Sequence, residues 1–155
     1  MKKYPNYRVF RANKSGSGCA LSFDLKHGEE KDTKLFLTVS KQGENNEKGD
    51  ATFKWKDKES VMTLLLGSND IGEILSVMKR KKECIDLFHQ NPRGNSTLKL
   101  AFNPPSDKYP PSFKIGVTTK REEKLLSAHT TISISESSVL EALLNQALLY
   151  IHGWV

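Results

Sequence analysis

The longest patterned apolar segment lies at the C-terminal end of the chain. From Ser135 to Val155, apolar side chains recur at helical spacing and form a wide stripe, made of Val139, Leu140, Leu143, Leu144, Ala147, Leu148 and Ile151. Ser135 is placed to cap the start of this helix, and Gly153 to end it in a left-handed conformation. A stripe this wide favours packing against a sheet, or against further copies of the same helix.

A shorter helix is predicted near the middle of the chain. Its apolar positions follow the i, i+3, i+4, i+7 pattern and are Ile71, Ile74, Leu75 and Met78. We expect Ser68 to cap this helix, with Asp70 in its first turn. Four consecutive cations at 79–82 follow it, and we interpret them as a solvated helix end where positive charge complements the helix dipole.

The remaining apolar segments have the length and alternation of β-strands. Before the short helix we expect strands at Tyr7–Arg11, Cys19–Leu25 and Leu35–Lys41, followed by Ala51–Lys56 and Ser60–Leu66 as two strands or one bent strand. After it we expect strands at Thr97–Phe102, Phe113–Thr119 and Thr130–Ser135, with Glu83–Phe88 either strand or irregular. Because helices and strands do not alternate, the order predicts an α+β protein and argues against a doubly wound parallel sheet.

The composition is typical of one globular domain spanning 1–155. With 37% hydrophobic and 27% charged residues, the chain is long enough to bury a core without disulfides. No apolar run reaches the ~20 residues of a membrane span, and no signal-peptide core is present. Cys19 and Cys84 lie far apart and are expected as reduced thiols. We therefore expect an intracellular protein, cytoplasmic or nucleoid-associated, and an organellar one only if a transit peptide has been removed.

The positive charge is large and unevenly placed. The formal net charge is +6 and the pI is near 9.3, which suits an anionic partner without identifying one. Residues 1–23 hold five cations and no acid, namely Lys2, Lys3, Arg8, Arg11 and Lys14. Charge alone therefore leaves nucleic acid and other interpretations equally open.

The sequence contains no recognisable catalytic or metal-binding pattern. Glycine-rich nucleotide loops, nucleophile elbows and HExxH zinc motifs are all missing. The four histidines stand apart, and Cys84 with His89 lacks a third and a fourth ligand. We therefore expect no enzymatic activity, no metal and no cofactor.

Aromatic and basic residues alternate in two stretches. Phe53 and Trp55 alternate with Lys54 and Lys56, so that a strand there places the rings on one face and the lysines on the other. A similar pattern occurs at Tyr7–Arg11, and Phe113 is followed directly by Lys114.

This alternation has two interpretations of similar weight. Proteins that bind single-stranded nucleic acid present aromatic faces on which bases stack, each worth ~1–3 kcal/mol, and cations along the backbone. Alternatively, the rings belong to the core and the lysines are the solvated side of an edge strand. Since opposite faces of one strand cannot both contact a flat ligand, phosphate contacts would come from neighbouring strands, from loops or from another subunit.

The order of several segments from Ala51 to the C-terminus resembles the Whirly family of single-stranded-DNA-binding proteins, relatives of the positive-cofactor-four coactivator fold. The matching segments are Lys54-Trp55-Lys56 with Val61-Met62-Thr63-Leu64, then 68–74 (SNDIGEI), 83–92 (ECIDLFHQNP), Leu98-Lys99-Leu100, 113–117 (FKIGV) and 147–154 (ALLYIHGW). Near the front, where the family has a Lys-Gly-Lys-Ala-Ala-Leu segment, only 18–21 (GCAL) is similar.

The resemblance implies two antiparallel four-stranded sheets packed across each other, with a short helix after the first and a long C-terminal helix after the second. It also implies a homotetramer assembled through its helical layer, which binds single-stranded DNA with little sequence preference during replication, recombination, repair or transcription. We expect the helix side chains Leu140, Leu143, Leu144, Leu148 and Ile151 at the interface between subunits.

The candidate nucleic-acid-binding residues combine rings and cations. The stacking candidates are Tyr7, Phe10, Phe53 and Trp55, and the phosphate-contact candidates are Arg8, Arg11, Lys14, Lys54, Lys56, Arg93, Lys114 and Lys120. Two alternatives stay open. One is an RNA-binding protein on the same architecture, as in the related guide-RNA-binding proteins of mitochondria, and the other is a protein-interaction module whose helical layer binds a different partner.

Overall fold

The computed structural model describes residues 5–28, 32–92 and 94–155. Within these residues the fold consists of two antiparallel four-stranded sheets, each followed by a helix. The first sheet contains β1 (Asn6–Arg11), β2 (Cys19–His27), β3 (Thr33–Lys41) and β4 (Val61–Leu66), and α1 (Ser68–Met78) follows it. The second contains β5 (Cys84–Asn91), β6 (Gly94–Asn103), β7 (Ser112–Arg121) and β8 (Lys124–Ser133), and α2 (Ile134–Ile151) ends the fold. This confirms the α+β class expected from the order of the elements and the two-sheet architecture that the family resemblance implies.

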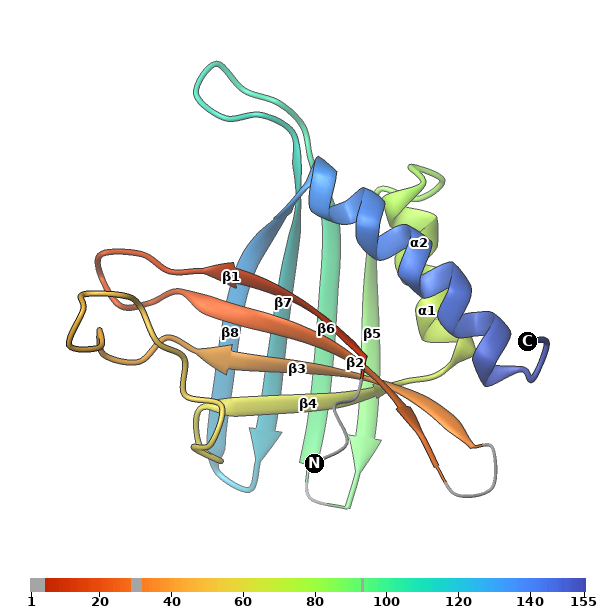
Figure 1. Ribbon diagram of the computed structural model, residues 1–155, viewed down its shortest axis with the longest axis horizontal. Helices are drawn as coiled ribbons and strands as arrows, with labels where there is room; N and C mark the ends of the chain where they lie inside the picture. Colours follow the sequence, from red (N-terminus) through yellow and green to blue (C-terminus); the bar gives the residue numbers. More distant parts are fainter. Residues whose placement is uncertain (1–4, 29–31, 93) are drawn as a thin grey trace.

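Each sheet pairs its strands in sequence order, and the two sheets cross, as Figure 1 shows. Alternation decides which side of each strand faces inward. In the first sheet, four aligned residues on the inner face are almost completely buried: Val9, Leu21, Val39 and Met62. In the second, Leu98, Val117 and Ala128 align in the same way. The core therefore lies between the two inner faces, and it leaves both outer faces for other contacts.

The N-cap of helix α1 lies one residue before the expected one. Its N-cap is Gly67 rather than Ser68, because the Asp70 carboxylate accepts a hydrogen bond from the Gly67 backbone N–H at 2.9 Å. His89 of β5 also lies against this carboxylate, with 3.1 Å between Nε2 and Oδ2. The predicted apolar face is confirmed, since Ile71 and Ile74 are fully buried.

Helix α2 begins at Ile134, with Ser133 rather than Ser135 as its N-cap. The Ser133 hydroxyl accepts a hydrogen bond from the Glu136 N–H at 3.1 Å, and the Glu136 carboxylate accepts one from the Ser133 N–H at 2.9 Å. Ser133 is three residues before a glutamate and so completes a capping box, which Ser135 does not. The predicted end is confirmed: Gly153 has φ +69°, and Trp154 N donates to the Leu149 carbonyl at 2.8 Å.

Two strand predictions need correction. Residues 51–60 form a loop with a single bridge, between Gln42 and Phe53, so the first sheet gains no strand at 51–56. Strand β8 starts at Lys124, six residues earlier than expected, because a tight turn at 122–123 returns the chain directly alongside β7. The left-handed backbone of Glu122 (φ 54°) makes this turn.

The apolar stripe of α2 divides into two faces. Leu140 and Leu144 are at most 1% exposed within the single chain, so the structure corrects their assignment to a subunit interface and makes them core residues. Leu148 and Ile151 are partly buried, while Leu143 remains 46% exposed. The exposed apolar side chains of α2 are Ile134, Val139, Leu143, Leu149 and Tyr150. The stripe is wide because one part of it packs on the protomer and another part does not.

Neither helix of the described residues is long and apolar enough to cross a membrane. Both cysteines are free thiols, with Cys19 buried and Cys84 exposed.

Candidate nucleic-acid interface

The outer face of the first sheet carries polar and aromatic side chains in aligned rows. Arg8, Ser22, Thr38 and Thr63 align across β1–β4, and Phe10, Ala20, Ser40 and Val61 form the next row. A third row contains Phe36 and Leu65. Phe10 and Leu65 are the large apolar side chains exposed in these rows, at 48% and 46%, whereas Ala20, Ser22 and Ser40 are buried. This face is therefore an open surface that can accept flat apolar groups.

The loop at 51–60 folds over one end of this face and completes it with two aromatic rings. Phe53 packs against Phe10, with 5.5 Å between the ring centroids. The guanidinium of Arg8 lies over the Trp55 ring, 4.8 Å from its centroid. Beneath the loop, Ala20 and Ser40 are fully buried even though they belong to the outer face. The rings of β1 and of the loop thus form one cluster from segments far apart in sequence.

Farther along the same face, Lys26 and Phe36 repeat the pairing of a cation with a ring. The Lys26 ammonium lies 4.8 Å from the Phe36 ring centroid. Such a cation–π contact holds the ammonium over the face of the ring. Lys26 and Phe36 were not among the candidate residues predicted from the sequence, although Phe36 lies at an outward position of the predicted strand at 35–41.

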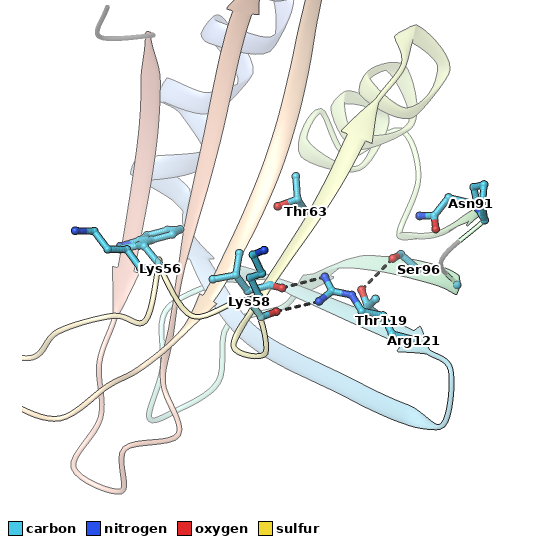
Figure 2. A pocket seen from close by; sticks show the side chains of 11 residues that line it. Lys56, Lys58, Thr63, Asn91, Ser96, Thr119 and Arg121 are labelled. Carbon is cyan, nitrogen blue, oxygen red and sulfur yellow. Dashed lines mark hydrogen bonds between the residues drawn. The ribbon is translucent and has the colours of Figure 1, made fainter. Parts of the chain in front are cut away.

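A pocket of about 680 Å³ opens beside this cluster, between the edge strand β4 and the turn end of the second sheet. Figure 2 shows Thr63, Asn91, Ser96 and Arg121 around its open space. Its lining residues are Trp55, Lys56, Lys58, Val61, Thr63, Asn91, Pro92, Gly94, Ser96, Thr119 and Arg121. The pocket therefore combines one aromatic ring, several hydroxyls and three cations.

Arg121 fixes the geometry of this pocket. Its guanidinium donates to the Lys58 carbonyl at 2.9 Å and to the Val61 carbonyl at 3.1 Å, which joins the second sheet to the entrance of β4 (Figure 2). A guanidinium has five N–H donors, so these two bonds leave others for a bound group. Next to it, the hydroxyls of Ser96 and Thr119 are hydrogen-bonded at 2.9 Å.

The turn before β4 is held by Asp57. Its carboxylate accepts hydrogen bonds from the Ser60 hydroxyl at 2.8 Å and from the Glu59 N–H at 3.0 Å. These two bonds lower the pKa of Asp57, the Ser60 bond having the larger effect. Lys124 of β8 reaches the Glu59 carboxylate at 2.7 Å. The loop that carries Trp55 and Lys56 is thus anchored to both sheets.

Tyr7 and Arg11 lie on the opposite face of β1, toward α2. The Arg11 guanidinium is hydrogen-bonded to the Glu136 carboxylate. Burial opposes ionisation of Glu136, but the hydrogen bonds from Ser133 and from Arg11 outweigh it and lower the pKa. Tyr7 lines a pocket of about 280 Å³ between β1–β3 and α2, where burial, followed by the Glu136 charge, raises its pKa. Both residues therefore have structural partners in the protomer, and a role in binding remains a prediction for them.

Lys14 lies exposed in the 12–18 connector between β1 and β2. The Gln42 side chain organises this connector, because its carbonyl accepts from the N–H groups of Asn13 and Gly18 at 3.0 and 3.1 Å. A β-carbon at Gly18 would lie 2.1 Å from the Arg11 carbonyl oxygen, so this crossing requires glycine. The connector therefore holds Lys14 in solvent, near the aromatic cluster but not part of it.

The other predicted cations lie on the loop at 51–60, on the second sheet or outside the described residues. Lys54 and Lys56 are exposed on the loop, and in Figure 2 the Lys56 side chain extends away from Arg121. Lys114 and Lys120 lie on the outer face of the second sheet, where Lys114, Lys99 and His129 line a groove of about 480 Å³. Arg93 lies outside the described residues. The structure thus brings together Arg8, Phe10, Phe53 and Trp55, and it adds Lys58 and Arg121, which no local sequence signal marks.

Comparisons with known proteins identify the fold. No family model and no curated protein matches the chain. Among solved structures, WHY1 from Arabidopsis thaliana is similar at a TM-score of 0.74 and 17% identity, over 99% of this chain and 88% of that one. MRP1/MRP2 from Trypanosoma brucei is similar at 0.70 and 18% identity, over 99% and 89%. A guide-RNA-binding protein complex bound to a guide RNA is similar at 0.69 and 20% identity, over 98% and 94%. The chain therefore has a Whirly-like fold.

Proposed function

We propose that this protein binds single-stranded DNA with little sequence preference, along the outer face of the first sheet and in the adjoining pocket. The observation that carries the proposal is the pairing of cations with partly exposed rings, in which Arg8 lies over Trp55 and Lys26 over Phe36. Aromatic faces beside a positively charged groove are the combination that single-strand-binding proteins use. The Whirly-like fold, which WHY1 shares, supports the same interpretation.

The shape of the surface favours single strands over duplex. In a duplex the bases stack on one another, so their faces are not available to Phe10 or Trp55. In a single strand each base can lie on a ring while its phosphate meets a neighbouring cation. Because all four bases offer such a face, we expect little discrimination among sequences.

Fluorescence titration tests the proposal directly. The chain has two tryptophans, Trp55 and Trp154, so a Trp154→Phe variant leaves Trp55 as the sole indole reporter. We expect oligothymidine to quench its emission and duplex DNA of equal length to have little effect. If phosphates contribute, the logarithm of affinity falls with the logarithm of salt concentration at about −0.7 per contacted phosphate. A Trp55 emission that ignores oligothymidine contradicts the proposal and favours a protein-interaction module.

RNA is the second candidate ligand. The observation that favours it is the likeness to a guide-RNA-binding complex, at 20% identity over 98% of this chain. Discrimination between the two ligands requires contacts to the 2′-hydroxyl, and the pocket hydroxyls of Thr63, Ser96 and Thr119 suit such contacts. Parallel titrations with DNA and RNA oligomers of one sequence decide between them, because tighter RNA binding would replace the leading proposal.

We further propose that the protein acts inside the cell as a homotetramer without catalytic activity, in replication, recombination, repair or transcription. The exposed apolar side chains of α2, among them Val139 and Leu143, support self-association, since such patches mark interaction surfaces. Light scattering coupled to size-exclusion chromatography tests the assembly. A mass of one protomer across the accessible concentration range would exclude the tetramer.

A further inference from the structure

The end of the second sheet that lies away from the pocket carries a second cluster of cations and rings, in which Phe102 is partly buried and Tyr109 is exposed. Ser96 lines the pocket, and Phe102 lies six residues farther along β6, which corresponds to about 20 Å at ~3.4 Å per residue. Around Phe102 the end of α1 and the loop between β6 and β7 meet. Figure 1 shows this loop projecting past the start of α2.

Segment 79–83 approaches Phe102 directly. The Phe102 N–H donates to the Glu83 carbonyl at 3.0 Å. The Arg80 guanidinium lies over the Phe102 ring, 3.3 Å from its centroid. Arg80 also has a left-handed backbone, with φ 64°. Glycine is the residue that adopts such a backbone after a helix without strain, so Arg80 adopts it at a conformational cost.

The cations of segment 79–83 differ in whether an acidic side chain pairs with them. Lys82 is paired with Glu73, at 2.6 Å. Within the described residues, the ammonium groups of Lys79 and Lys81 make no hydrogen bond or ion pair, and both side chains are exposed. Glu83 is the one acid of segment 79–83. Three cations at the base of the projecting loop are therefore available to an anionic partner.

The projecting loop is stiff and presents an aromatic ring at its tip. Pro104-Pro105 and Pro110-Pro111 form its two sides, and proline fixes the backbone φ angle. At the tip, the Ser106 N–H donates to the Tyr109 carbonyl at 2.9 Å, and the Tyr109 N–H donates to the Ser106 hydroxyl at 3.2 Å. Tyr109 is 69% exposed and follows Lys108. A rigid loop thus holds a ring and a cation in solvent.

We propose that Lys79, Arg80, Lys81, Lys108 and Tyr109 form a second contact surface for single-stranded nucleic acid. The lysines and Arg80 meet phosphates, and a base stacks on Tyr109. This inference rests on the proposed function and extends it. A nucleic-acid strand long enough to pass beyond the pocket meets a second contact surface at the other end of the second sheet. The solvated helix end expected from the sequence accounts for Lys82, whose partner is Glu73, but not for a strained arginine placed on a ring.

Oligomer length separates the two surfaces. We compare a Lys79→Glu/Lys81→Glu protein with the parent on oligothymidines of about six and about thirty nucleotides, a range that brackets common site sizes. The short oligomer occupies the tighter first surface, so its affinity should change less than twofold. The long oligomer should bind about tenfold more weakly, and its salt slope should decrease by about 1.4, or 0.7 for each lost phosphate contact. Tyr109→Ala should weaken binding of the long oligomer only, by about 5- to 150-fold.

Two controls make the result decisive. Lys48→Glu alters the charge of an exposed loop residue outside both surfaces and should leave both oligomers unaffected, whereas Lys81→Glu alone should already weaken the long one. A Lys79→Gln/Lys81→Gln protein repeats the test without introducing acids. Equal affinity and equal salt slope for parent and variants on the long oligomer would overturn the second surface. A parent that binds neither oligomer would instead refute the proposed function.

Discussion

The guanidinium of Arg8 lies 4.8 Å from the ring centroid of Trp55, so the outermost strand of the first sheet holds a ring that belongs to a loop. The contact covers one face of the indole, and the same ring lines the pocket. A cation on one side of an aromatic ring and an open pocket beside it are suited to a stacked base whose phosphate approaches the cation.

Replacing Trp55 should therefore weaken single-strand binding in proportion to the ring that is lost. We expect Trp55→Ala to reduce affinity for oligothymidine by about 5- to 150-fold, the equivalent of one stacked base at ~1–3 kcal/mol. Trp55→Phe keeps a flat ring and should lose less than tenfold. Fluorescence anisotropy of a labelled oligomer measures both, with Trp154→Phe as the matched control. A folded Trp55→Ala protein with undiminished affinity would remove Trp55 from the site.

Arg121 should contribute to stability as well as to binding. Arg121→Met keeps most of the side-chain stem but removes the donors to the Lys58 and Val61 carbonyls. Charged hydrogen bonds of this kind are worth about 1.5–3 kcal/mol, and we expect a loss of about 1–2 kcal/mol because the group is partly exposed. Urea denaturation measures it. Lys124→Gln, which breaks only the exposed pair with Glu59, should leave the midpoint nearly unchanged; equal effects of the two variants would contradict the anchoring role of Arg121.

The capping carboxylate of Glu136 should make stability depend on pH. Its pKa in the folded protein is below the ordinary value of 4.5, since the hydrogen bonds from Ser133 and Arg11 outweigh the effect of burial. A lowered folded pKa means that the stabilisation is complete above pH 4.5 and is lost as the pH falls through the folded value. The difference in unfolding free energy between the parent and Glu136→Gln should accordingly shrink below pH 4.5. Glu141→Gln, which removes a carboxylate from the same helix outside the capping box, is the control for the change of residue.

Regular periodicity explains why the helices and most strands were predictable. The apolar spacing of α2 and the glycine at 153 are local signals, and both are confirmed. The cap was misplaced because Ser133 also continues the alternation of β8, and only its reciprocal bonds with Glu136 identify it as the helix start.

The candidate site depends on contacts that no local pattern encodes. The alternation of Phe53 and Trp55 with lysines is typical of a strand, yet the bonds of Asp57 fold the following residues into a turn, and the rings pack against Phe10 and Arg8 instead. Arg121 shows the same limit more clearly. Its two acceptors, the carbonyls of Lys58 and Val61, precede it by 63 and 60 residues. The anchoring role of Arg121 can therefore be recognised only in the folded chain.

The two cysteines should differ strongly in reactivity. Burial raises the pKa of the Cys19 thiol to about 11, and its sulfur lies 3.6 Å from the His129 carbonyl, whereas Cys84 is exposed. Because the thiolate is the reactive form, an aromatic disulfide reagent at pH 8 should label one thiol in the native chain and two after denaturation. A Cys84→Ser protein should show no fast phase. Rapid labelling of that variant would mean that Cys19 is accessible.

The two faces of α2 predict opposite consequences for neighbouring leucines. Leu144 is buried within the protomer and Leu143 is 46% exposed. Leu144→Ala should destabilise the protomer by about 2–5 kcal/mol, since it leaves a cavity against the sheets. Leu143→Asp should cost the folded protomer little, but it places a charge in the proposed interface and should convert tetramers to smaller species. Light scattering and urea denaturation separate these effects. If Leu143→Asp left the assembly intact, the subunits would have to associate through another surface, and α2 would serve the protomer alone.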